Sequence, residues 1–150
     1  MLRNGSQRSQ ARPRYETESD LSNERQVISI FSEKFNCTFS KMPIRYGLDY
    51  AMSRDGKVRA FAEIKCRSNP VSQYDTYMLS LGKLVSAHNL RVATGLDCFL
   101  MVRWTDAVGF IKMDSGFSVA VGGRLDRNDW QDIEPVVHYP IDNFKIRALS

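Results

Sequence analysis

Residues 46–67 read YGLDYAMSRDGKVRAFAEIKCR, and this stretch decides the fold. Two β-prone segments, at about residues 48–53 and 57–66, flank the turn signal Asp55-Gly56, which is typical of a β-hairpin. The second segment is apolar in its centre, as expected for a strand that is buried on both faces. We therefore expect a hairpin in which the longer strand belongs to the core of a sheet.

Three charged residues interrupt this hairpin, in the pattern D-x13-E-x-K formed by Asp49, Glu63 and Lys65. If Asp49 lies opposite Glu63, the strands sort into two faces, because directly opposed residues share a face and successive residues alternate. One face is then apolar, and its pairs are Leu48/Ile64, Tyr50/Ala62 and Met52/Ala60. The other face carries the pairs Asp49/Glu63, Ala51/Phe61 and Ser53/Arg59, with Lys65 two residues further along.

A shift of one residue would mix these faces, so the hydrophobic pattern favours the register that brings the two carboxylates together. This register requires a loop with an odd number of residues, and we expect three residues, Asp55 to Lys57, with Gly56 free to adopt a positive φ.

Two adjacent carboxylates repel each other unless a cation lies between them. A hard divalent ion such as Mg²⁺, for which Mn²⁺ can substitute, is usually held by one or two carboxylates, with water and substrate phosphate completing the shell. Such an ion activates water and polarises a phosphodiester, while a nearby lysine orients the water or offsets charge in the transition state. The pattern therefore predicts a metal-dependent phosphodiesterase, although a structural salt-bridge ladder from Glu63 to Lys65 or Arg67 is the alternative.

Glu24 is a further candidate for a catalytic role. It lies in a segment with helical periodicity at about residues 20–36 and shares a stripe with Ile28, Phe31 and Phe35, so it is expected to face the core. The alternative is that Glu24 only favours the positive end of the helix dipole.

The remaining segments predict the order helix, strand, strand, strand, helix, strand, strand. A short β-prone segment spans residues 37–42, a second helix is expected at about 79–94 with Gly95 as its C-cap, and strands are expected at about 98–104 and 108–113. The strand–helix–strand unit implies a right-handed parallel crossover, so the sheet should be mixed. Residues 68–77 are expected to form a polar loop.

Further strands are expected at about residues 117–121 and 136–139. Because Pro135 and Pro140 bracket the last of these, we expect it at the edge of a sheet.

The order helix-Glu, strand-Asp, strand-Glu-x-Lys, helix, strand resembles the PD-(D/E)XK nuclease superfamily over about residues 20–113. The resemblance implies an α/β (α+β mixed) fold with a restriction-endonuclease-like αβββαβ core, in which helices flank a central mixed sheet. It implies that Asp49, Glu63 and the backbone carbonyl of Ile64 bind the metal and that Lys65 is the catalytic lysine. The chain has Leu48-Asp49 where the superfamily has Pro-Asp. Members of this size resemble phage-type endonucleases and Holliday-junction resolvases.

Candidate nucleic-acid contacts lie close to this motif. Arg67 follows Lys65 on the same strand face, Gln73 and Tyr77, together with Tyr74, lie in the loop that leaves the strand, and Lys83 lies near the start of the second helix. For Lys83 the alternative is a solvated side chain.

Net charge gives no strong signal for a particular nucleic acid. The formal charge of +4 comes from Arg3, Arg8, Arg12 and Arg14, which all precede the first acid; without them, 17 basic groups face 17 acidic groups. We expect residues 1–19 to form a disordered basic arm that either contacts phosphates or has no role, and residues 20–150 to form a single nuclease-like domain.

The composition excludes several other classes. No apolar run approaches the roughly 18 residues of a membrane span, and there is no signal-peptide pattern, so a cytoplasmic protein is expected, in the host cytoplasm if the source is viral. Three cysteines without C-x-x-C spacing favour reduced thiols over a zinc site. Neither histidine has a nucleophile or acid partner at a telling spacing, which argues against a Ser/His or Cys/His hydrolase.

The sequence thus predicts a Mg²⁺-dependent DNA endonuclease without an organic cofactor. A homodimer that resolves branched DNA is a special case of this prediction. The alternatives are an RNA nuclease and a non-catalytic nucleic-acid-binding or scaffolding domain that keeps the nuclease fold.

Overall fold

The computed structural model describes residues 18–123 and 133–150. The helices are α1 (Glu18–Phe35) and α2 (Leu81–Thr94), with short 3-10 turns at Ile44–Tyr46 and Ile141–Asn143. The strands are β2 (Thr38–Lys41), β3 (Tyr50–Arg54), β4 (Lys57–Cys66), β5 (Thr76–Ser80), β6 (Asp97–Arg103), β7 (Ala107–Lys112), β8 (Ser118–Gly123), β9 (Ile133–Pro140) and β10 (Lys145–Ala148). The basic arm predicted at residues 1–19 lies, up to residue 17, outside the described residues.

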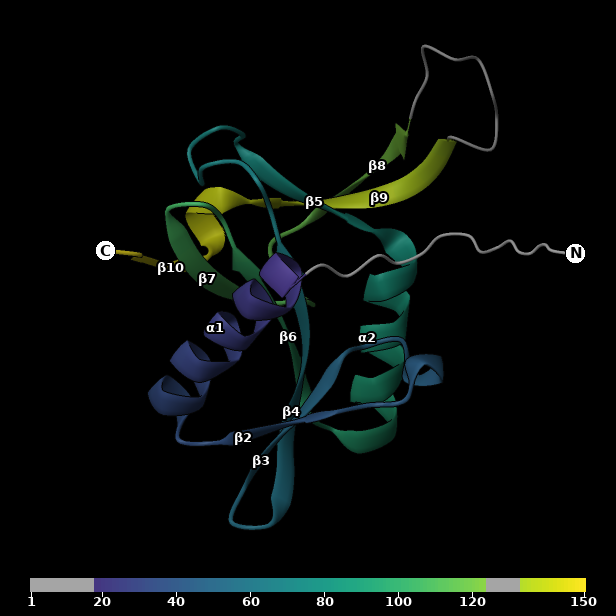
Figure 1. Ribbon diagram of the computed structural model, residues 1–150. Helices are drawn as coiled ribbons and strands as arrows, with labels where there is room; N and C mark the ends of the chain where they lie inside the picture. Colours follow the sequence, from purple (N-terminus) through teal and green to yellow (C-terminus); the bar gives the residue numbers. More distant parts are fainter. Residues whose placement is uncertain (1–17, 124–132) are drawn as a thin grey trace, which may run out of the picture.

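Six strands form the main sheet in the order β10-β7-β6-β4-β3-β2. The β4–β6 pair is parallel and connected through α2, whereas the other pairs are antiparallel, so the prediction of a mixed sheet is confirmed. Figure 1 shows α1 and α2 on opposite sides of β4 and β6. Each helix covers its own core: Val27 and Phe31 of α1 pack on one sheet face, and Ala87 of α2 packs on the other.

The hairpin register is confirmed in its central part. Tyr50 pairs with Ala62, Ala51 with Phe61 and Met52 with Ala60. The predicted Ser53/Arg59 pair and the three-residue loop are wrong, because the register shifts after Met52 and Ser53 pairs with Val58. A two-residue turn closes the hairpin, with positive φ at both Asp55 and Gly56, and the bulge supplies the odd residue that the loop was expected to contain.

The faces of this hairpin also follow the prediction, with one exception. Tyr50, Met52, Ala60, Ala62 and Ile64 share the core with α1, whereas Ala51 and Phe61 face α2. Leu48 was expected beside Ile64 but packs in the α2 core instead, because β3 begins only at Tyr50 and the chain before it leaves the strand geometry.

A second sheet, of three strands in the order β5-β9-β8, lies beyond the end of β4 (Figure 1). The predicted loop at residues 68–77 therefore ends early, because Thr76 already pairs with Pro140 in β5. The expected edge position of residues 136–139 is also wrong, since β9 is the central strand. Pro135 has a ladder partner only in β8 and Pro140 only in β5, so one side of β9 is unpaired at each proline and can accommodate the missing N–H.

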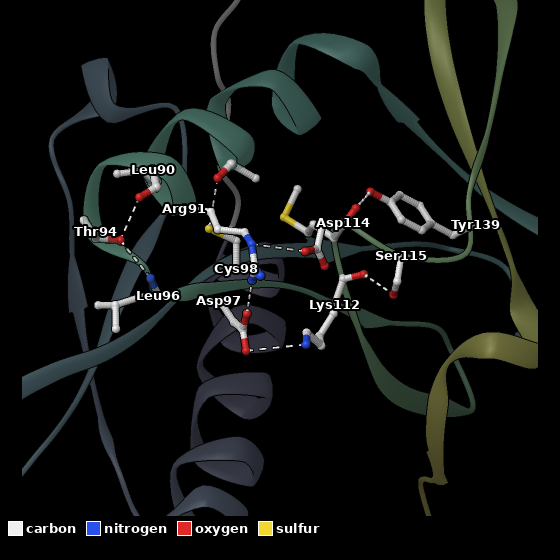
Figure 2. Close-up of polar contacts among 12 residues, drawn as sticks. Leu90, Arg91, Thr94, Leu96, Asp97, Cys98, Lys112, Asp114, Ser115 and Tyr139 are labelled. Atoms are coloured by element: carbon white, nitrogen blue, oxygen red, sulfur yellow. Dashed lines mark hydrogen bonds and ion pairs between the residues drawn. The ribbon is translucent and has the colours of Figure 1, made fainter.

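The carboxyl end of α2 is tied to the strands beneath it, as Figure 2 shows. Arg91 pairs with Asp97 at the start of β6 and, through Nε, with Asp114 Oδ2 at 3.3 Å. Gly95 ends the helix with φ +75°, and its N–H donates to the carbonyl of Arg91, which confirms the predicted C-cap. These contacts fix the position of a helix whose other end lies beside Glu63.

Among the described residues, no helix is both long and apolar enough to cross a membrane. The thiols of Cys37, Cys66 and Cys98 are all free.

Candidate active site

Asp49 and Glu63 lie next to each other where β3 meets the last third of β4. The ladder of the hairpin ends with the pair Tyr50 and Ala62, and Asp49 and Glu63 are the next residues on the two sides. Asp49 Oδ2 accepts a hydrogen bond of 3.2 Å from the N–H of Ile64, and the Asp49 carbonyl accepts one of 2.9 Å from the N–H of Met42. Main-chain groups on both sides therefore hold the aspartate at the edge of the hairpin.

Glu63 is the buried charge of the site, with only 2% of its surface exposed. Two lysines contact its carboxylate: Nζ of Lys83 lies 3.2 Å and Nζ of Lys65 lies 3.5 Å from Oε2. Burial raises the pKa of Glu63, the negative charge of Asp49 raises it further, and the two ammonium groups act in the opposite direction. The two ammonium groups thus offset part of the cost of an ionised, buried carboxyl group.

Lys83 is fixed as well as close. Its Nζ donates a hydrogen bond of 2.9 Å to the carbonyl of Gly47, in addition to the contact with Glu63. Gly47 has φ +81° and lies so near α2 that a Cβ there would be 2.3 Å from Oγ of Ser86. The turn before Asp49 and the first two turns of α2 therefore lie close together around the lysine.

The donor set fits a hard divalent cation. The carboxylates of Asp49 and Glu63 lie near each other. The N–H of Ile64 donates to Asp49, and the C=O and N–H of one residue in a strand point to the same side. The main-chain carbonyl of Ile64 is therefore also directed towards Asp49. Mg²⁺ is commonly held by one or two carboxylates together with water and phosphate. Within the described ranges there is no cluster of three or more His, Cys, Asp or Glu side chains that could hold a metal ion.

A cavity of about 270 Å³ is lined by Asp49 and Lys83. Its walls come from the segment between β2 and β3 and from the first turn of α2 (Lys41, Met42, Ile44, Gly47, Leu48, Asp49 and Lys83). Ile44 is 96% exposed at its rim, so the cavity faces solvent.

The structure does not bring Glu24 together with this group. Its carboxylate accepts a short hydrogen bond from the hydroxyl of Tyr50 and lies 3.9 Å from Nζ of Lys41. Tyr50 belongs to the core that α1 covers, whereas Ala51 and Phe61, which share a face with Glu63, belong to the core under α2. Glu24 is connected to the site through the start of β3, where Tyr50 follows Asp49.

The other predicted contact residues lie around the end of β4. The guanidinium of Arg67 stacks 4.5 Å from the ring centre of Tyr77. Tyr77 itself is only 3% exposed, so this residue, predicted to face DNA, is part of the core. Gln73 is exposed, and its side-chain amide donates a hydrogen bond of 3.1 Å to the hydroxyl of Tyr74.

Sequence reasoning assigned Lys83 to a phosphate contact and missed its pairing with Glu63. Part of this pairing could have been predicted, because the helix after β4 covers the sheet face that carries Glu63 and Lys83 lies in the first turn of this helix. Trp104 and His138, which line a second cavity together with Arg67, were not predicted as functional residues. No local pattern connects these two residues with Arg67, because tertiary structure alone brings them together.

Comparison with solved structures finds the same fold in the Holliday junction resolvase Hjc of the archaeal hyperthermophile Archaeoglobus fulgidus. The TM-score is 0.53 and the sequence identity 10%, over 82% of this chain and 84% of the Hjc chain. At this identity the likeness concerns the restriction-endonuclease-like fold and no more. No curated protein sequence matches the chain. A family model described as "Phage putative PDDEXK endonuclease" matches residues 10–147.

Proposed function

The chain belongs to the phage PDDEXK endonuclease family, and from this premise we propose that it is a Mg²⁺-dependent endonuclease that hydrolyses phosphodiester bonds of DNA. The observation that carries the proposal is the meeting of Asp49, Glu63 and Lys65 at one end of the β3–β4 hairpin. The repulsion between the two carboxylates costs stability, and a divalent cation removes this cost.

Each residue has a distinct task in this proposal. Asp49, Glu63 and the carbonyl of Ile64 hold the ion, which when bound acts as a Lewis acid on the scissile phosphate and acidifies a water molecule. Lys65 is exposed enough to reach substrate, with 36% of its side chain accessible, and orients the water or offsets charge on the phosphate. Lys83 neutralises Glu63 when metal is absent and is a second cation for the phosphate when metal is present.

We extend the proposal to the substrate. The fold is shared with a Holliday junction resolvase, which supports a branched substrate. Branched DNA is therefore the favoured substrate. A junction requires two cuts, so we propose that the enzyme acts as a homodimer, which light scattering with and without a four-way junction tests.

The decisive experiment incubates the protein with labelled four-way junctions, linear duplex, single-stranded DNA and RNA in Mg²⁺, in Mn²⁺ and in EDTA. We expect strand cuts on junction DNA in either metal and none in EDTA. Asp49→Asn and Lys65→Met should each remove cleavage, whereas Val92→Ala, an exposed change on the far part of α2, should leave it unchanged.

Three results would contradict the proposal. Cleavage in EDTA would exclude the metal role, and full activity of Asp49→Asn or Lys65→Met would exclude the assigned site. Binding of DNA without cleavage under any condition would favour the non-catalytic alternative, and cleavage of RNA alone would identify a ribonuclease.

A further inference from the structure

A second cavity, of about 510 Å³, lies beyond the carboxyl end of β4. It is formed by the loop after β4, by β5 and β9, and by the residue that follows β6. The lining is aromatic, polar and basic at once (Arg67, Asn69, Val71, Tyr74, Thr76, Tyr77, Met78, Trp104, His138 and Ile141). The volume falls in the range of roughly 300–1,000 Å³ that is usual for small-molecule sites.

This cavity lies near the active site. Arg67 lines it and comes directly after the last residue of β4, two residues beyond Lys65. The charge of Glu63 acts on the Tyr77 ring: burial raises the pKa of Tyr77 and Glu63 adds to this, while Arg67 lowers it. A group in the cavity would therefore lie next to a phosphate that is bound at Lys65.

Two flat surfaces border the cavity. The guanidinium of Arg67 lies 4.5 Å from the centre of the Tyr77 ring, and Nη2 donates a hydrogen bond of 3.3 Å to the carbonyl of Met78, so its plane is fixed while the side chain stays exposed. Tyr74 is 60% exposed, and the amide of Gln73 holds its hydroxyl. Exposed aromatic rings and arginine planes are the surfaces on which single-stranded nucleobases stack.

Hydrogen-bonding groups complete the lining. The ring of His138 is fixed by a contact of 2.9 Å between Nδ1 and the hydroxyl of Thr76, and Asn69 provides an amide. The hydroxyl of Tyr77 is the one buried side-chain polar atom without a partner among the described residues. A purely structural pocket would be expected to be apolar or to pair its polar groups internally.

From these observations we propose that the cavity receives an unpaired nucleobase of the DNA strand, adjacent to the scissile phosphodiester. A base inside a duplex is stacked and paired and cannot enter such a pocket without being extruded. The enzyme would thus favour a cut next to an unpaired nucleotide, as occurs at branch points, bulges and single-stranded ends. This inference rests on the proposed nuclease function, because it takes the position of the scissile phosphate from Lys65.

The test compares two DNA duplexes of one sequence, in which a 2-aminopurine is either bulged or paired. Binding is measured in EDTA by fluorescence anisotropy, so that no strand is cut, and stacking is read from quenching of the 2-aminopurine. We expect the bulged duplex to bind about tenfold more tightly, since stacking of one base contributes on the order of 1–3 kcal/mol, and to be quenched. Tyr74→Ala should remove most of this preference, and Tyr74→Phe should keep it.

The variants are chosen so that folding does not decide the result. Tyr74 is largely exposed, and Val92→Ala, at a position that is 73% exposed on α2, serves as a control that should leave the preference intact. Equal binding of the two duplexes, or an equal loss on both with Tyr74→Ala, would overturn the inference.

A separate arm in Mg²⁺ distinguishes this inference from the proposed function. If wild type cuts no substrate, the nuclease proposal fails whatever the binding result. If it cuts bulged and paired duplexes at the same rate and Tyr74→Ala changes neither rate, the nuclease proposal stands and the pocket inference fails.

Discussion

Nζ of Lys83 lies 3.2 Å from Oε2 of Glu63, although the lysine comes from α2 and the glutamate from β4. The same ammonium group binds the carbonyl of Gly47, so it connects three segments around the carboxylates. This lysine is one of the two positive charges, with Lys65, that the protein itself supplies to a buried acid near Asp49. A divalent ion bound by Asp49 and Glu63 would take over the same task.

Substitution of Lys83 should therefore destabilise the protein in a way that depends on Mg²⁺. In EDTA, Lys83→Met leaves Glu63 with Lys65 as its remaining ion-pair partner, and we expect a loss of about 1–2 kcal/mol in the free energy of unfolding, allowing for the partial exposure of the lysine. In saturating Mg²⁺ this loss should shrink, because the ion neutralises the carboxylates. Urea unfolding under both conditions measures the difference.

Arg91→Met is the matched control for this experiment. It removes ion pairs from the other end of the same helix, where the arginine is 43% exposed, so the loss should be roughly 0.5 kcal/mol and equal with and without Mg²⁺. A loss for Lys83→Met that Mg²⁺ does not change would contradict the proposed exchange of charges.

Metal binding and catalysis should be separable by substitution. Asp49→Asn removes a proposed ligand, so Mg²⁺ affinity should fall at least about tenfold. Lys65→Met removes no ligand and should leave this affinity equal or slightly higher, since a neighbouring positive charge is lost, while cleavage falls by roughly 100-fold or more. Isothermal titration with Mg²⁺, run beside a cleavage assay, measures both. Loss of Mg²⁺ binding in Lys65→Met would show that the two roles are not distinct.

Glu24 was predicted to assist catalysis, and its contact with Tyr50 suggests that it does so by positioning. The hydroxyl of Tyr50 donates to its carboxylate, and Tyr50 directly follows Asp49. We expect Glu24→Leu and Tyr50→Phe to raise the Mg²⁺ concentration needed for half-maximal cleavage by similar factors of about 3 to 10, as for groups that orient a metal ligand. The double variant should resemble either single variant, because both changes break one hydrogen bond.

A direct role for Glu24 gives a different result in the same cycle. Glu24→Leu would then remove cleavage at saturating Mg²⁺, and Tyr50→Phe would retain it. The two variants thus decide between a residue that acts through Asp49 and one that contacts the substrate.

The hairpin shows how far the sequence alone leads. Alternation of apolar residues identified the pairing of Tyr50 with Ala62, because a shift by one residue would bury charges on one face. The alternation did not reveal the bulge near Ser53, because a bulge and a loop with one more residue both leave the central pairs on the same faces. Register is determined by burial over several pairs, whereas the choice of turn depends on local backbone energies.

The second sheet was the harder part to predict. Residues 76–80 follow a polar segment and pair with residues some 60 positions later in the chain. The local pattern of apolar residues therefore did not predict β5. The prolines around Val136 suggested an edge strand, because a proline cannot donate a hydrogen bond to a neighbouring strand. This expectation failed because each proline of β9 is paired with only one of the two neighbouring strands. Contacts that are distant in sequence, including the pairing of Lys83 with Glu63, were missed for the same reason.

Cys98 predicts a loss of stability at alkaline pH. Its thiol lies beneath α2, and burial, with smaller contributions from the negative charges of Asp97 and Asp114, raises its pKa from 9.0 to about 11. The folded state then holds the thiol proton more tightly than the unfolded state, so this contribution is complete below pH 9 and is lost as the pH rises towards 11. Between these values, wild type should lose stability more steeply than Cys98→Ala, which urea unfolding at a series of pH values measures. Parallel pH profiles would show that the thiol does not titrate in this way.

Gly47 is predicted to be essential for the geometry beside Asp49. Its φ of +81° costs an alanine about 1–2 kcal/mol, and the added Cβ would also lie 2.3 Å from Oγ of Ser86. Gly47→Ala should therefore lose more stability than Gly95→Ala, which has φ +75° and no atom within 4 Å of the added Cβ. The difference isolates the steric clash, and thermal unfolding of both variants measures it.

A second change tests whether this clash is with Ser86 itself. Ser86→Gly removes the two side-chain atoms that a Cβ on Gly47 would meet, at a cost of about 1 kcal/mol for glycine within a helix. The double variant should lose less stability than the sum of the losses of the two single variants, because Ser86→Gly removes the atoms with which the new Cβ would clash. Strictly additive losses would mean that the turn moves away from α2, in which case the hydrogen bond from Lys83 to the carbonyl of Gly47 would break and Mg²⁺ affinity should change together with stability.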